Sequence, residues 1–327
     1  MKVLVTGGAG FIGSHVVDSV LATGHEVRIF DLVPSPYHDP REVEMVVGDI
    51  ADSDAREKAV AGCDMIAHLA AISDVNDVVD DPLRAEAVNA RGTALLLEAA
   101  RAHGVIRFVY ASTIWVYGNA RGVEPLDEDT QLVLPSHLYT ATKLAGEMYC
   151  RSYGELYGLE HTILRFGIPY GPRSRTSTVL AAFVERALAG RTLMITGDGS
   201  QSRQFVFVED LARGVVAALG SPRPNRIYNL VGDETTTVRE IAETVRQLVS
   251  SVEIVHVDSR PGDLRSVEIS SARAARELHW SADTPFAEGA RRYVESVTPT
   301  HRSPQSATAS KTSGRAATVV LQEPSEL

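Results

Sequence analysis

The chain has 327 residues, of which 44% are hydrophobic and 23% charged, and its formal net charge is −10 at pH 7. This length is enough for a large core, arranged as one domain with a smaller lobe or as two domains. The acidic balance argues against nucleic acid or an anionic membrane surface as a general partner.

Targeting signals and cysteines bear on where the chain works. No stretch approaches the roughly 18 consecutive apolar residues that a membrane span requires. The apolar run Val3–Val5 leads directly into glycines and is too short for a secretory signal. Cys63 and Cys150 lie far apart without metal-ligand spacing, so we expect reduced structural thiols and no metal site. These features predict a cytoplasmic protein without a membrane or nucleic-acid partner.

Short β-rich runs alternate with helical patterns through the first half of the chain. This alternation predicts an α/β fold with a parallel sheet and right-handed crossovers. The expected strands are Lys2–Thr6, Glu26–Asp31, Val43–Gly48, Asp64–Ala70, Val105–Ser112 and Glu160–Phe166. The expected helices are Ile12–Ala22, Pro82–His103 and Leu138–Tyr157.

The spacing of elements loosens in the second half of the chain. The expected helices there are Val179–Ala189, Asp210–Leu219 and Val238–Ser250, and the expected strands are Leu193–Ile195, Phe205–Val208 and Arg226–Leu230. We expect residues 1–171 to form the first domain and residues 172–297 a smaller α/β lobe, with some later elements returning to the first domain. Residues 298–327 are rich in Ser and Thr and poor in large apolar side chains, which predicts a disordered tail.

The first expected strand is followed at once by a glycine-rich turn. Gly8, Gly10 and Gly13 fit the pattern G-x-G-x-x-G, placed after a strand and before a helix. In that setting the glycines form a tight turn, let a pyrophosphate touch the backbone, and let helix and strand pack closely. The helix N-terminus then faces the phosphates with unpaired N–H groups. The sequence therefore predicts a dinucleotide site in a Rossmann-type, doubly wound parallel sheet.

Asp31 ends the second expected strand, eighteen residues beyond Gly13. A carboxylate at this position accepts hydrogen bonds from an adenosine ribose and repels a 2′-phosphate. The position therefore favours NAD over NADP. The alternative is a strand-end aspartate that only caps a turn.

Two further stretches carry groups that could do chemistry. Tyr139 and Lys143 are four residues apart in a helix-favouring stretch, so both side chains emerge on one face. An ammonium beside a phenol stabilises the phenolate and lowers the tyrosine pKa, which makes a base for neutral pH. Ser112 and Thr113 offer hydroxyls at the carboxyl end of a strand, where open α/β folds place their ligands. The alternatives are that Tyr139 and Lys143 are an ordinary surface pair and that the two hydroxyls only form a turn. The dinucleotide pattern earlier in the chain disfavours both alternatives.

Several short motifs, in order along roughly residues 1–295, give the chain a family resemblance. They are TGGAGFIGSH, GDI, HLAA, Asn89 with Gly92-Thr93, STIWVYG, YTATK, YGP and RQFVFVEDLA. With them the chain resembles the extended short-chain dehydrogenase/reductase family, in its nucleotide-sugar epimerase and dehydratase group. The resemblance implies NAD as cofactor, a nucleoside-diphosphate sugar as substrate, and a homodimer formed through the helices Pro82–His103 and Leu138–Tyr157.

The resemblance also implies roles for the matching positions. Tyr139 would take the proton from a sugar hydroxyl, Lys143 would hold the nicotinamide ribose and lower the Tyr139 pKa, and Thr113 would hydrogen-bond the reacting oxygen. The implied cofactor-binding residues are Gly7, Gly10, Phe11, Ile12, Gly13, Asp31, Asp49, Ile50, Leu69, Ala70, Ala71, Asn89, Tyr139 and Lys143. The implied substrate-binding residues are Thr113, Arg175, Arg203, Arg260 and Asp263.

Among the implied substrate ligands, Arg203 and Arg260 match phosphate-binding arginines and Asp263 matches a ribose-binding carboxylate. A pair of arginines suits two phosphates because each guanidinium can bond two oxygens at once. An ordinary solvated surface role is the alternative for each arginine.

Positions 114 and 115 bear on the reaction. The dehydratases that this chain resembles carry Asp-Glu directly after the catalytic hydroxyl, and the decarboxylases carry a glutamate at the second position, whereas this chain has Ile114 and Trp115. Elimination therefore lacks its proton shuttle. We expect an NAD-dependent 4-epimerase of the UDP-glucose/UDP-galactose type, acting through a transient 4-keto sugar.

Three alternatives stay open at this point. Ile168 stands where the family often has an asparagine, and Arg175 matches an arginine of hexuronate 4-epimerases, which makes UDP-glucuronate a second candidate substrate. A 4,6-dehydratase or decarboxylase with an acid from elsewhere is another. A non-catalytic NAD-sensing module would need Asp31 but would have no use for both Tyr139 and Lys143.

Overall fold

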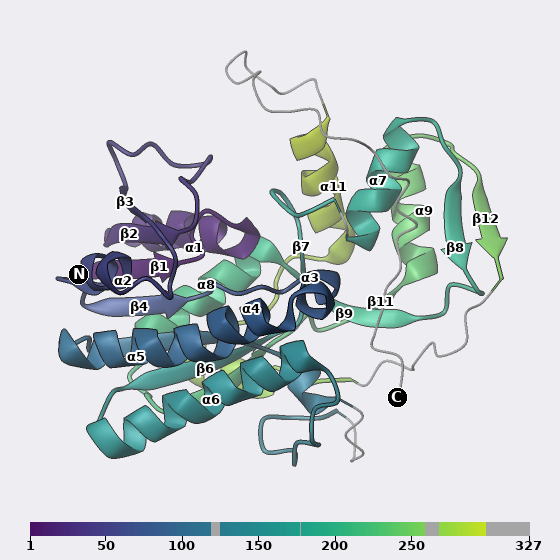
Figure 1. Cartoon of the computed structure of the whole chain (residues 1–327). Helices are drawn as coiled ribbons and strands as arrows, with labels where there is room; N and C mark the ends of the chain where they lie inside the picture. The colour runs from purple at the N-terminus through teal and green to yellow at the C-terminus, as the bar shows by residue number, and fades with distance from the viewer. Residues whose placement is uncertain (119–124, 177, 259–267, 299–327) are drawn as a thin grey trace.

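A parallel sheet forms the centre of the molecule (Figure 1). The structure is a computed structural model and describes residues 1–118, 125–176, 178–258 and 268–298. Within these ranges seven strands pair in parallel in the order β10-β6-β5-β4-β1-β2-β3. They are β1 (Lys2–Thr6), β2 (Glu26–Asp31), β3 (Glu44–Val47), β4 (Met65–His68), β5 (Arg107–Thr113), β6 (His161–Phe166) and β10 (Arg226–Leu230).

The strand order reverses direction between β1 and β4, because β2 and β3 lie on one side of β1 and β4, β5 and β6 on the other. This reversal defines a doubly wound sheet, and the crevice at the carboxyl ends of its central strands is where such sheets bind ligands. The predicted Rossmann-type fold is confirmed.

Helices cover both faces of the sheet. One core includes Val3, Val5 and apolar residues of α1 (Phe11–Ala22) and α8 (Val208–Leu219). The other includes Leu4 and apolar residues from helices on the opposite face. These helices are α2 (Ser53–Val60), α5 (Gly92–Ala102) and α6 (Leu138–Tyr157). Successive residues of β1 thus point to opposite faces, which explains why its sequence is apolar throughout rather than alternating.

A third core lies in the second half of the chain, which Figure 1 shows to one side of the main sheet. The helices α7 (Val179–Leu188), α9 (Val238–Leu248) and α11 (Phe286–Val297) contribute to it. Two small sheets accompany them, one in the order β11-β9-β7 and one in the order β12-β8. Their strands are β7 (Ile168–Tyr170), β8 (Leu193–Thr196), β9 (Ser202–Phe207), β11 (Thr235–Thr237) and β12 (Ile254–Val257). Although both are late in the chain, β10 is a strand of the main sheet and α8 packs on one face of that sheet.

The helix expected over Pro82–His103 is interrupted. It consists of α4 (Pro82–Glu86), a π-helical turn η1 (Ala87–Arg91) and α5. The sequence pattern also did not predict several helices, turns and strands. These are α2, α3 (Val75–Asp80), the 3₁₀ turn η2 (Ile114–Tyr117), α10 (Ala272–Leu278), α11 and the strands β7, β11 and β12.

Other expectations can be compared with the described ranges only. No described helix combines the length and apolarity needed to cross a membrane, and the described residues contain no group of three or more side chains arranged to hold a metal ion. Cys63 and Cys150 are buried free thiols. Of the expected tail, residues 298–327, all but residue 298 lie outside the described residues.

Candidate active site

The glycine turn between β1 and α1 has the geometry that the sequence pattern predicts. Gly7 has a φ of +71°, and a Cβ there would lie 2.8 Å from the backbone nitrogen of Ala70. A Cβ on Gly13 would lie 2.0 Å from the carbonyl oxygen of Gly7. Gly10 is the exposed N-cap of α1, with no side-chain cap and no acidic residue in the first turn. Unpaired N–H groups at this helix end therefore remain available to an anion.

Asp31 lies next to this turn at the carboxyl end of β2. Its Oδ2 accepts a 3.0 Å hydrogen bond from the Ala9 N–H, and its Oδ1 accepts one of 2.7 Å from the Leu32 N–H. The carboxylate is partly exposed and no cation pairs with it among the described residues. A partly exposed anion at this place suits a ribose diol and opposes a 2′-phosphate.

The two candidate hydroxyls at the end of β5 have different surroundings. Ser112 donates a 2.6 Å hydrogen bond to Oε1 of Glu147 and is buried. Thr113 Oγ1 accepts a 3.2 Å hydrogen bond from the Trp115 N–H, and its own O–H has no acceptor among the described residues. Thr113 therefore keeps a donor for a substrate oxygen, and Ser112 does not.

Tyr139 and Lys143 both lie on the first turns of α6, and in this structure the pKa of the phenol is raised rather than lowered. Lys143 Nζ donates a 2.9 Å hydrogen bond to the Ala111 carbonyl and lies 5.1 Å from the ring centre of Tyr110. Burial lowers the pKa of Lys143 to about 8 and raises the pKa of Tyr139 to about 12. In this structure the burial of the phenol outweighs any stabilisation of its anion.

An aromatic wall lies beside the phenol. The ring of Trp115 meets the ring of Tyr139 edge-on, at 6.0 Å between centroids, and the ring of His137 edge-on at 6.4 Å. Ile114 and Trp115 form the start of the turn η2. Neither carries a titratable group, so no carboxyl follows the Thr113 hydroxyl along the chain.

A buried polar network lies beneath these groups. Glu147 forms a two-pronged ion pair with Arg165, at 3.0 Å to the Nε and 2.8 Å to the Nη2, and both side chains are 3% exposed. Arg165 also donates to the Tyr117 hydroxyl at 3.0 Å, and Tyr117 donates to Oδ1 of Asn229 at 2.8 Å. The network connects α6 with β6 and β10, on which Arg165 and Asn229 lie.

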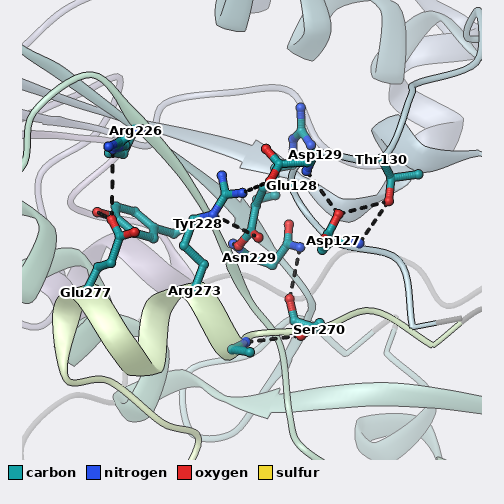
Figure 2. Close-up of polar contacts among 12 residues, drawn as sticks. Asp127, Glu128, Asp129, Thr130, Arg226, Tyr228, Asn229, Ser270, Arg273 and Glu277 are labelled. Carbon is teal, nitrogen blue, oxygen red and sulfur yellow. Dashed lines mark hydrogen bonds and ion pairs between the residues drawn. The ribbon is translucent and has the colours of Figure 1, made fainter.

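Asn229 joins this network to a second buried acid (Figure 2). Its backbone N–H donates to Glu128 Oε1 at 2.7 Å, and its side-chain amide donates to the Ser270 carbonyl at 3.1 Å. Arg273 lies 3.5 Å from Glu128 and 2.5 Å from Asp129. Burial raises the pKa of Glu128 against the opposing effect of its hydrogen bonds. Helix α6 is thereby linked through Asn229 to Glu128 and Ser270.

Comparisons with known proteins identify the family of the chain. The model of the NAD dependent epimerase/dehydratase family matches residues 3–231. The chain belongs to this family. It is 37% identical over 308 residues to a UDP-glucose 4-epimerase of Mycolicibacterium smegmatis, covering 90% of this chain and 98% of that one. It is 32% identical over 311 residues to a dTDP-glucose 4,6-dehydratase of Streptomyces niveus, covering 90% and 92%.

Solved structures give the same result. The fold matches that of the UDP-glucose 4-epimerase of Thermotoga maritima, determined with UDP-glucose, with a TM-score of 0.84 and 32% identity over 90% of this chain and 98% of that one. The predictions of the family, of NAD as cofactor and of an NAD-dependent nucleotide-sugar epimerase are confirmed.

The residues of this family member fit the cofactor. A Cβ would fill the turn at Gly7 and Gly13, the α1 N-terminus is open, and Asp31 presents a carboxylate beside it. Phe11 and Ile12 form the first turn of α1, where Ile12 packs on the core. NAD supplies a hydride acceptor and donor when bound, and the protein supplies the proton chemistry.

A hydrogen-bond chain that the sequence analysis missed fixes the loop after β4. Thr93 Oγ1 donates to the Asn89 carbonyl at 2.6 Å and lies 2.9 Å from His68 Nε2. Because Thr93 uses its proton, His68 must donate from Nε2 and accept at Nδ1, which lies 2.7 Å from Thr6 Oγ1. Thr6 in turn accepts 3.1 Å from the Ala70 N–H. The neutral imidazole therefore positions the backbone of Leu69 and Ala70 against Gly7.

Three predicted cofactor residues are already engaged with the protein. The Asn89 amide accepts from the Ile72 N–H at 2.8 Å and donates to the Ile72 carbonyl at 2.9 Å. Asp49 forms a 2.5 Å ion pair with Arg84, and although partial burial opposes it, the Ala51 N–H and Arg84 lower the pKa of Asp49. The side chain of Ile50 is buried. Asn89 thus acts on the β4 loop through its amide, in the π-helical turn η1.

The predicted substrate ligands in the second half are only partly described. Arg203 lies on β9 and donates to the Ser202 carbonyl at 2.8 Å. Arg175 is exposed, and no ion pair holds it to any other residue in the described ranges. Ile168 begins β7 and lies opposite Phe205. Arg260 and Asp263 lie outside the described residues.

Proposed function

We propose that this protein is an NAD-dependent nucleotide-sugar 4-epimerase of the UDP-glucose/UDP-galactose type. The proposal is supported by Thr113 at the carboxyl end of β5, by Lys143 of α6 bonded to the Ala111 carbonyl of the same strand, and by Tyr139 of α6 beside Trp115. Ile114 and Trp115 themselves offer no acid or base. A 4-epimerase needs one base on the reacting hydroxyl, whereas an elimination needs a second proton shuttle.

The residues would divide the work as follows. Thr113 donates its free O–H to the reacting oxygen and orients it. Tyr139 removes the hydroxyl proton and later returns it, so no net proton is consumed. Lys143 begins the cycle on the Ala111 carbonyl, and its ammonium must turn toward the phenol to lower the tyrosine pKa from about 12. NAD, held by the glycine turn and Asp31, would supply the hydride acceptor and donor for the carbon that bears this hydroxyl.

The deciding experiment incubates the purified protein with UDP-glucose, UDP-glucuronate and dTDP-glucose separately, without added NADH or NADPH, and follows the products by proton NMR. We expect UDP-galactose from UDP-glucose. A 4-keto-6-deoxy sugar from dTDP-glucose would make the protein a dehydratase, and carbon dioxide from UDP-glucuronate would make it a decarboxylase.

UDP-glucuronate is the second candidate substrate, favoured by one observation. Arg175 is exposed and unpaired among the described residues, so its guanidinium is available to a hexuronate carboxylate. Replacing Arg175 by Ala distinguishes the two substrates. A hexuronate epimerase loses most of its kcat/KM for UDP-glucuronate in this variant, whereas a UDP-glucose epimerase keeps its activity.

We also propose a cytoplasmic homodimer formed through α4, α5 and α6. Support comes from large apolar side chains that α4 and α6 leave exposed, among them Leu83 at 81%, Leu156 at 72% and Met148 at 57%. Light scattering after size-exclusion chromatography measures the mass, with a dimer expected near twice 35.3 kDa. Replacing Leu156 by Arg should shift the mass toward the monomer.

A further inference from the structure

The catalytic helix α6 begins with an unusual cap. His137 is its N-cap residue, with extended backbone at φ −103° and ψ 132°, and its Nδ1 accepts a 3.2 Å hydrogen bond from the Tyr139 N–H. Its carbonyl accepts the first helical hydrogen bond, from the Ala141 N–H at 3.0 Å. Ser, Thr, Asp and Asn are the usual residues at this position. None of these four changes its charge between pH 5 and 8, whereas histidine does.

The capping bond fixes the protonation state of the imidazole. Nδ1 can accept only when it carries no proton, so the ring is neutral and Nε2 carries the proton. No described residue accepts a hydrogen bond from Nε2. The ring is 8% exposed and lies edge-on to Trp115, which is also edge-on to Tyr139. The His137 imidazole therefore contacts both the backbone N–H of the catalytic tyrosine and the Trp115 ring that packs against that tyrosine.

We propose that His137 is a positioning residue for Tyr139, which it holds in place only as a neutral imidazole capping α6. This rests on the proposed function, because it assigns the tyrosine the role of base. Protonation of His137 turns Nδ1 into a donor, so the bond from the Tyr139 N–H is lost. It also places a positive charge at the positive end of the helix dipole, which opposes the helix start.

The titration lies on the acid side of neutrality. Burial lowers the pKa of His137 below its usual value near 6.5. No charged side chain among the described residues pairs with the ring, and Tyr139 is the titratable group that faces it, through Trp115. The cap is therefore intact at pH 7 and lost as the pH falls through the His137 pKa.

The test compares the pH dependence of kcat in the wild type, His137→Asn and His137→Ala. Asparagine caps a helix as well as any residue and does not titrate. We expect the wild-type kcat to fall about fivefold as the pH drops through the His137 pKa, because a typical N-cap contributes about 1 kcal/mol. His137→Asn should keep its activity there, and His137→Ala should show the low value at all pH values. His256→Asn, on exposed β12, is the control and should retain the wild-type profile.

Two measurements without substrate keep this inference separate from the proposed function. Nitrogen-15 NMR of the imidazoles should show His137 with its proton on Nε2 at pH 7. Amide hydrogen exchange, corrected for intrinsic rates, should show Tyr139 less protected at pH 5 than at pH 7 in the wild type but not in His137→Asn. A proton on Nδ1 at pH 7, or an acid limb that is unchanged in His137→Asn, overturns the proposal. A wild type that is inactive on every nucleotide sugar overturns the proposed function and leaves both of these measurements valid.

Discussion

Glu147 and Arg165 form a two-pronged ion pair in which each side chain is 3% exposed. Breaking a buried pair by removing one charge costs about 3–5 kcal/mol, because the remaining charge loses its compensation. We therefore expect Glu147→Gln to lower the free energy of unfolding by an amount in this range, measured by urea denaturation. A loss below about 1 kcal/mol would show that water compensates Arg165.

A substitution at Tyr117 should disturb the same network less. Its hydroxyl accepts from Arg165 and donates to Asn229, and its ring is 2% exposed. Tyr117→Phe keeps the ring and the ion pair but leaves Asn229 Oδ1 without its donor and Arg165 Nη1 without its acceptor. We expect a loss of about 1–3 kcal/mol in urea denaturation, smaller than that of Glu147→Gln. Equal losses would mean that the network fails as a unit.

The glycine turn allows a matched pair of substitutions. Gly7 and Gly24 have similar backbone angles, with φ of +71° and +79°, but a Cβ at Gly7 meets Ala70 at 2.8 Å and one at Gly24 meets nothing within 4 Å. Gly24→Ala should cost only the left-handed backbone strain of about 1–2 kcal/mol. Gly7→Ala should cost more and should abolish NAD retention, measured by mass spectrometry of the released cofactor. Retention of NAD by Gly7→Ala would contradict the close approach at this turn.

His68 makes the stability of the fold depend on pH. Burial, followed by the charge of Lys143, lowers its pKa to about 3, whereas it titrates near 6.5 in the unfolded chain. Between these values the unfolded state binds one more proton, so His68 lowers the stability by about 1.4 kcal/mol per pH unit as the pH falls. Urea denaturation at pH 7, 6 and 5 should show this slope, and His68→Gln should reduce it. Proton NMR should show no titration of His68 between pH 5 and 8.

Much of the sheet could be predicted from the sequence. Strands that are buried on both faces appear as apolar runs, and glycine-containing turns and helical stretches separate these runs along the chain. The bounds of β1, β2, β10 and α6 agree residue for residue with the expectation. The π-helical turn in the segment Pro82–His103 could not be predicted from the apolar spacing, which continues through it, although Asn89 and Gly92 are weak helix formers. The bonds of Asn89 to Ile72 lie at this turn, and their partner is seventeen residues away in sequence.

The candidate site also contains residues that local sequence predicts and residues whose roles depend on distant partners. Spacing along the chain was enough to predict the glycine turn and to select Asp31, Tyr139 and Lys143 as candidate site residues. Spacing could not distinguish Ser112 from Thr113, because the difference depends on the distant acceptor Glu147. It also missed His68 and His137, whose roles arise from hydrogen bonds to backbone and hydroxyl groups that only the fold brings near.

Tyr139→Phe separates catalysis from every structural role of this position. No described residue accepts a hydrogen bond from the phenol, so removing its oxygen should change the free energy of unfolding by no more than about 0.5 kcal/mol. The loss of a general base costs about 10²–10⁴-fold in rate, and we expect the epimerase kcat to fall by this factor while NAD stays bound. Proton NMR of the nucleotide sugars measures the rate, and mass spectrometry measures the retained NAD. A variant that kept more than about a tenth of the wild-type kcat would show that another group removes the proton, because a general base contributes more than tenfold.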